Sequence, residues 1–190
     1  MLTMARRRDI EITDAVTASI TAVALLVALT VADALLGHAL ARFGIVPRTT
    51  SGLLGIVFSP LLHANFRHVM ANAVPLFVLL LLLQSDSRYR PYRTLALIWL
   101  ASGLGTWLIG RGNAVHIGAS SIVFGLAAFL ITAGFVMRSW RSAVVAIFVL
   151  VLYGGIFYGA LPQAGPISWE GHLCGAVAGV WTAARLRGAA

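Results

Sequence analysis

Long apolar runs alternate with short polar segments along the whole chain. Six runs approach the roughly 20 residues that an α-helix needs to cross the hydrocarbon core of a bilayer. They cover residues 15–36, 61–83, 92–110, 118–137, 141–161 and 171–187. The pattern predicts an all-α, polytopic membrane protein. Residues 15–187 are expected to form one bundle of six transmembrane helices, after a polar N-terminal tail at residues 1–14.

The composition indicates that lipid is the main solvent. Of the 190 residues, 59% are hydrophobic and only 11% are charged, and the mean hydropathy is +0.91. Soluble domains usually carry about a quarter charged residues, so this chain has too few charges to cover a water-facing surface. The net charge of +8 does not predict nucleic-acid binding, because the basic residues are all arginines in short clusters between apolar runs.

The distribution of arginines predicts how the bundle is oriented. Short cytoplasmic segments of membrane proteins carry an excess of positive charge. With the N-terminus in the cytoplasm, the cytoplasmic segments hold Arg6, Arg7, Arg8, Arg88, Arg90, Arg93, Arg138, Arg141, Arg185 and Arg187. The outer segments then hold only Arg42, Arg48, Arg67 and Arg111. This bias predicts a multi-pass protein of the cell inner (plasma) membrane with both termini in the cytoplasm.

Five polar side chains on three predicted helices come to one depth near the outer surface. They are His68 and Asn72 on the second helix, Ser120 and Ser121 on the fourth, and His172 on the sixth. Each alone has a structural explanation, such as a serine bonded to a carbonyl one turn back or an interfacial histidine. Packing alone gives these residues no reason to share a level, so the pattern predicts a single site.

The residue types in this set are those of a serine hydrolase. A serine hydroxyl attacks well once a base takes its proton, and histidine is the usual base near neutral pH. Adjacent helix positions point about 100° apart, so only one of Ser120 and Ser121 can face His172. His68 and Asn72 lie four residues apart on one helix face and both donate hydrogen bonds. Together they could hold a developing negative oxygen.

Small residues are expected to bring the two catalytic helices together. In the sixth predicted helix, glycines recur every four residues, at Gly171, Gly175 and Gly179. The fourth predicted helix has small positions at Gly118 and Gly125. Small residues at such spacing let two membrane helices approach closely. This contact would place a serine within reach of His172.

The sequence predicts a dyad rather than a triad. A triad needs a carboxylate to orient the histidine, and the outer half of the bundle offers only Asp33 and Glu170. Glu170 lies two residues from His172, which places it on another face of the helix. A Ser–His dyad without metal or cofactor is therefore expected, and its less firmly held base predicts slow turnover.

Three stretches of the chain resemble the rhomboid family of intramembrane serine proteases, in its minimal six-helix bacterial form. They are "GIVPRTTSGLLGIVFSPLLHANFRHVMAN", "GASSIVFGL" and "GHLCGAVAG", and the resemblance extends over about residues 44–182. It implies a rhomboid-like helix bundle and a serine-type endopeptidase. The implied partners are transmembrane protein substrates, cleaved near the outer membrane surface, and the lipid bilayer.

The resemblance also assigns roles to individual residues. Ser120 is implied as the nucleophile and His172 as the base. His68 and Asn72 are implied as the residues that stabilise the oxyanion in the transition state. The supporting residues are Gly118 before the nucleophile, Phe124 packed on the catalytic histidine, and Gly175 in the sixth helix.

The chain departs from the family motif at one position. Rhomboid proteases have Gly-x-Ser-Gly, whereas Ser121 stands here in place of the last glycine. One alternative is therefore a catalytically inactive rhomboid-like protein that binds transmembrane helices. A second alternative is a transporter lined by His63, His68, His116 and His172. The inner halves of the helices lack the charged residues that such a transport path uses, and no helix has a zinc-binding histidine pair.

Overall fold

The computed structural model describes residues 2–186, with side chains from residue 12 onward. Its α-helices are α1 (Leu2–Leu35), α2 (Gly52–Phe58), α3 (Phe66–Gln84), α4 (Pro91–Ile109), α5 (Ser120–Val136), α6 (Trp140–Tyr153) and α7 (Trp169–Ala184). Four 3₁₀ segments join them: η1 (Ala39–Phe43), η2 (Ser59–Leu61), η3 (Ser87–Tyr89) and η4 (Gly154–Ala160). Six long helices and one short one therefore confirm the predicted all-α bundle.

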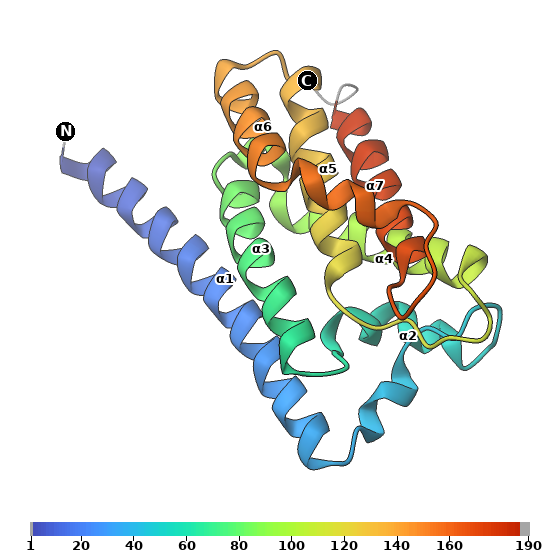
Figure 1. The fold of residues 1–190 in the computed structure, drawn as a ribbon. Helices are drawn as coiled ribbons and strands as arrows, with labels where there is room; N and C mark the ends of the chain where they lie inside the picture. The colour runs from blue at the N-terminus through green and yellow to red at the C-terminus, as the bar shows by residue number, and fades with distance from the viewer. Residues whose placement is uncertain (1, 187–190) are drawn as a thin grey trace.

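Helix α5 lies at the centre of the bundle. Its residues 122–130 are all buried, because α3, α4, α6 and α7 pack around it (Figure 1). Helix α1 lies outside this group and packs along α3. Within the described residues, α1 from Ile12, α3 and the α6–η4 segment are long and apolar enough to cross a membrane. The central helix is apolar but shorter, and other protein surrounds it.

Several element boundaries differ from those read off the sequence. Helix α1 begins at Leu2, so residues 2–14 are helical where a tail was expected. Helix α3 begins only at Phe66, because Asn65 caps it by accepting a hydrogen bond from the His68 N–H at 2.9 Å. The segment before it forms α2 and η2. Helix α7 begins earlier than expected, at Trp169, and its expected end at 187 lies outside the described residues.

Glycines set the distance between α5 and α7. A Cβ atom added at Gly175 would collide with the carbonyl oxygen of Ser121, and one added at Gly179 would collide with that of Gly125. The two backbones therefore touch directly, as the glycine spacing predicted. This contact brings the first turn of α5 beside the first turn of α7.

Candidate active site

The first turns of α5 and α7 carry a hydrogen-bonded serine and histidine. Ser120 is the first residue of α5, and His172 lies in the first turn of α7. The Ser120 Oγ lies 2.9 Å from the His172 Nε2. Both side chains are partly buried, so the pair sits inside the bundle and still reaches a cavity. This is the geometry of a nucleophile and its general base.

The second ring nitrogen of His172 contacts a backbone carbonyl. Its Nδ1 lies 2.9 Å from the carbonyl oxygen of Gly159, in the 3₁₀ segment η4. A carbonyl can only accept, so Nδ1 carries the proton and Nε2 is left to accept the Ser120 hydroxyl. The carbonyl thus does the orienting that a carboxylate does in a triad. Nothing in the sequence pointed to Gly159, because every residue offers a main-chain carbonyl.

An aromatic ring holds the other side of the histidine. Phe124, one turn after Ser120 on α5, stacks on the His172 ring with centroids 4.1 Å apart and planes inclined by 13°. Phe157 in turn meets the edge of Phe124, at 5.9 Å between centroids. The imidazole is therefore fixed by a stacked ring as well as by the hydrogen bond to Gly159.

The two adjacent serines differ in their contacts with other side chains. The Ser120 Oγ is hydrogen-bonded to His172, and both serines line a small cavity of about 20 Å³ that also borders α4. Polar side chains line the same cavity, among them Thr106, His116 and Ser168. The backbone oxygen of Ser121 also faces Gly175 across the helix contact. The hydrogen bond thus distinguishes the serines, and Ser120 is the one placed to act with His172.

His68 and Asn72 lie across the cavity from the dyad, on the first turns of α3. A cavity of about 730 Å³ is lined by both of them together with Ser120, Phe124 and His172. The Asn72 Nδ2 donates to the carbonyl oxygen of His68 at 3.1 Å. These side chains and the hydrogen-bonded Ser120 and His172 thus border one space large enough for a peptide segment.

Gly118 sits against His68 in a backbone conformation that favours glycine. Its φ is +118°, and a Cβ there would lie 2.8 Å from the Cε1 and Nε2 atoms of His68. Its N–H donates to the carbonyl of Ser59 at 2.8 Å. The glycine therefore permits the turn into α5 and leaves room for the His68 ring next to Ser120.

His63 holds the start of α5 in place through a hydrogen bond to its backbone. Its Nε2 accepts a hydrogen bond from the backbone N–H of Ala119, the residue before Ser120, at 3.3 Å. Burial, together with the nearby His68, lowers the pKa of His63 to about 4. The ring is therefore neutral at physiological pH and able to accept. In the sequence, His63 stood out only as one of the four histidines of the transporter alternative, and nothing there indicated this partner.

A buried ion pair ties together the loops that precede α5 and α7. The Arg111 Nε lies 2.8 Å from Oε1 of Glu170, whose side chain is buried. Arg111 also donates to the carbonyls of Gly165 and Ile167 in the loop before α7, at 3.2 and 2.6 Å. Glu170 is therefore engaged with Arg111 and does not contact His172 as an orienting carboxylate.

His116 reinforces the same junction. Its Nδ1 lies 2.6 Å from the Ser168 Oγ, and its Nε2 lies 3.2 Å from the carbonyl oxygen of Arg111. Burial lowers the pKa of His116, which favours the neutral ring. Among the described residues, no group of three or more His, Cys, Asp or Glu side chains is placed to hold a metal ion.

Comparison with known families matches residues 50–189 to the family described as the Rhomboid domain. That range is most of the chain and contains every residue of the site above. The chain belongs to the rhomboid family. Helix α1 precedes the matched range, so the rhomboid domain itself accounts for α2–α7 and for the cavity between them.

Mycobacterial proteins are similar to this rhomboid over most of its length. The uncharacterized protein Rv1337 of Mycobacterium tuberculosis (strain ATCC 25618 / H37Rv) is 47% identical over 172 residues, which cover 86% of this chain and 72% of the relative. The uncharacterized protein ML1171 of Mycobacterium leprae (strain TN) is 41% identical over 170 residues, which cover 85% of this chain and 67% of the relative. No solved structure gives a significant match.

Proposed function

We propose that the protein is an intramembrane serine endopeptidase that cleaves transmembrane helices of other membrane proteins. The observation that carries this proposal is the 2.9 Å contact between the Ser120 Oγ and the His172 Nε2. It joins a nucleophile to an oriented base at the border of a large cavity. Membership of the rhomboid family supports the same activity, because the family is generally proteolytic.

The geometry supports a two-step acyl transfer. The Ser120 oxygen attacks the carbonyl carbon of the substrate peptide while its proton passes to the His172 Nε2. The imidazolium then gives that proton to the departing amine, and the C–N bond breaks to leave an acyl-enzyme. A water molecule, deprotonated by the same nitrogen, attacks the ester and releases the new carboxyl end and the Ser120 hydroxyl.

His68 and Asn72 are proposed to stabilise the negative oxygen that forms during both attacks. They lie on one face of α3 and border the same cavity as Ser120. The first N–H groups of a helix lack intrahelical acceptors, so the backbone at the start of α5 supplies donors beside the nucleophile. Such donors lower the barrier because they are already oriented before charge develops.

The cavity suggests which substrates can be cut. A transmembrane helix hides its amide bonds in its own hydrogen-bond ladder, so it must unwind before Ser120 can reach a carbonyl. Helices that unwind easily, with a small residue before the cut, fit this requirement. The lining combines small and apolar residues such as Ala71, Ala114 and Ile156 with the polar groups at the dyad. Such a lining suits a partly unwound apolar segment, which has both apolar side chains and exposed backbone polar groups.

The proposed setting is the cell inner (plasma) membrane, with both termini in the cytoplasm. Under this arrangement the starts of α3, α5 and α7 face the outer surface, where the dyad lies. The ends of these helices, and the arginine clusters near them, face the cytoplasm. Cleavage is then expected near the outer membrane surface.

The decisive experiment combines probe labelling with a cleavage assay in proteoliposomes. A serine-directed fluorophosphonate should label the wild-type protein and not the Ser120→Ala variant. The wild type should also cut a model transmembrane substrate, and Ser120→Ala and His172→Ala should not. If the wild type bound the substrate but was neither labelled nor active in cleavage, the inactive, helix-binding alternative would be supported. That alternative arises because Ser121 occupies the family's glycine position.

A further inference from the structure

A second cavity lies at the end of the bundle away from the dyad. It has a volume of about 470 Å³ and opens between the start of α4 and the end of α7. This cavity opens at the start of α4, where Arg93 lies about 24 Å along the helix axis from Ile109, at the end of α4 nearest the site. It therefore shares no lining residue with the catalytic cavity.

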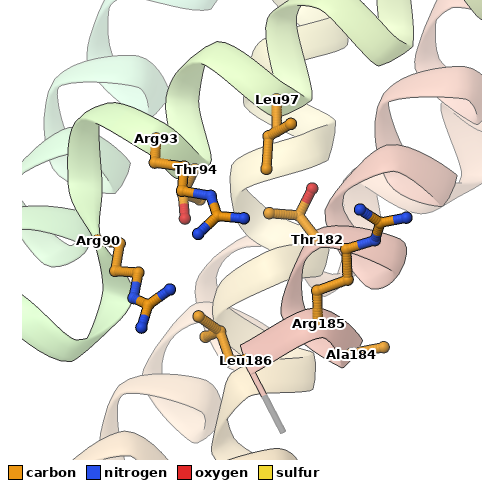
Figure 2. A pocket seen from close by; sticks show the side chains of 8 residues that line it. All are labelled: Arg90, Arg93, Thr94, Leu97, Thr182, Ala184, Arg185 and Leu186. Atoms are coloured by element: carbon orange, nitrogen blue, oxygen red, sulfur yellow. The ribbon is translucent and has the colours of Figure 1, made fainter. Parts of the chain in front are cut away.

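Arginine side chains dominate the polar lining of this cavity. Arg90, Arg93 and Arg185 all contribute to its wall. Figure 2 shows the Arg93 guanidinium extending across the gap between the helices toward Thr182, and that of Arg90 extending toward Leu186. Arg185 turns aside in this view, and its guanidinium stacks on Trp181 at 4.0 Å from the ring centroid.

These positive charges are not neutralised within the described part of the protein. No carboxylate whose side chain is described forms an ion pair with Arg90, Arg93 or Arg185. The Thr182 hydroxyl in the same wall is buried and has no hydrogen-bond partner among the described residues. Buried polar groups normally have partners, so the cavity combines unpaired cations with an unsatisfied hydroxyl.

The rest of the lining is apolar. Leu97, Ala184 and Leu186 line the cavity beside the guanidinium groups. Farther along α4, Leu100 and Leu104 are exposed on the bundle surface. A ligand here would meet cations at one end and apolar side chains along the helix. A phospholipid matches this pattern, because it has an anionic headgroup and apolar acyl chains. Basic pockets between transmembrane helices are suited to anionic headgroups.

We propose that this cavity binds the phosphate group of an anionic phospholipid, with Arg90 and Arg93 as its main ligands. Guanidinium groups pair with phosphate oxygens through two parallel N–H donors. The apolar wall favours a lipid-borne phosphate over a free one, since the first acyl carbons would lie against Leu97 and Leu186. The site is independent of the dyad and of proteolysis.

The test measures lipid binding to the full-length protein in a neutral detergent. Native mass spectrometry would follow titrations with phosphatidylglycerol, phosphatidylcholine and inorganic phosphate. The double variant Arg90→Gln/Arg93→Gln removes the proposed ligands. The matched control, Arg138→Gln/Arg141→Gln, removes the same charge at the same end of the bundle but outside this cavity.

The cavity variant is expected to bind phosphatidylglycerol at least about tenfold more weakly, while the control stays within about threefold of wild type. The affinity of Arg93→Lys for phosphatidylglycerol should lie between those of the two double variants, because lysine keeps the charge and lacks the planar guanidinium group. Equal weakening in both double variants would overturn the proposal, since it would mean general surface attraction. If inorganic phosphate displaced the lipid at equal concentration, the proposal of a phospholipid ligand would be overturned. The site would then be one for soluble phosphate.

Discussion

The His172 imidazole lies almost parallel to the phenyl ring of Phe124, at 4.1 Å between ring centroids. Together with the hydrogen bond from Nδ1 to the Gly159 carbonyl, this stack leaves the imidazole little freedom to rotate. The base of the proposed dyad is thus held by a ring and a backbone carbonyl where a triad uses a carboxylate.

The two serines should differ sharply in a cleavage assay. Ser120→Ala should abolish cleavage, because it removes the oxygen bonded to the base. Ser121→Ala should keep most of the activity, because the hydrogen bond to His172 comes from Ser120 and the Ser121 backbone that packs on Gly175 is unchanged. Both variants can be assayed side by side on a model transmembrane substrate in proteoliposomes. Loss of cleavage in Ser121→Ala with full activity in Ser120→Ala would reverse the assignment of the nucleophile.

Removing the stacked ring should slow the chemical step. Phe124→Leu is expected to lower kcat by about tenfold while KM changes less than about threefold, because the base is misplaced more than the substrate site. Phe157→Leu is the matched control, since it removes only the edge contact to Phe124. A change confined to KM, or an equal effect in both variants, would mean that Phe124 shapes the cavity and does not position His172.

Gly118 should matter for activity more than for folding. Gly118→Ala forces a side chain onto a backbone with φ +118° and pushes a Cβ to 2.8 Å from the His68 ring. Gly165→Ala is the control, because Gly165 has a similar φ of +112° but open space around it. Both variants carry backbone strain on the order of 1–3 kcal/mol, and both should melt at similar temperatures. Only Gly118→Ala should lose most of its cleavage activity.

The sequence revealed the parts of the site that depend on residue type and helix position. Ser120 and His172 stand in the first turns of their helices, next to glycines whose spacing predicts close packing, so the helix pattern alone brought them to one level. The carbonyl of Gly159 could not be found in this way, because it belongs to an irregular 3₁₀ segment. The partner of Glu170 was equally hidden, since Arg111 lies in a loop whose path depends on tertiary contacts.

Breaking the pair between Arg111 and Glu170 should destabilise the protein strongly. Arg111→Gln leaves the buried Glu170 carboxylate without its cation, which should lower the free energy of unfolding by about 3 kcal/mol. The double variant Arg111→Met/Glu170→Met should recover much of this loss, because it leaves no uncompensated charge. Thermal melting in detergent would compare the variants. If the single and double variants have the same melting temperature, the loss of stability in Arg111→Gln does not come from an uncompensated Glu170 charge.

The stability of the fold should depend on the neutral form of His63. Its pKa falls from 6.5 to about 4 on folding, so the folded state resists protonation more than the unfolded state. The contribution to stability is complete above pH 6.5 and is lost progressively as the pH falls toward 4. His63→Gln keeps an acceptor for the Ala119 N–H and has no proton to bind in this range. Melting temperatures measured between pH 7 and pH 4 should therefore fall less in His63→Gln than in the wild type, and identical pH profiles would contradict the role given to this buried ring.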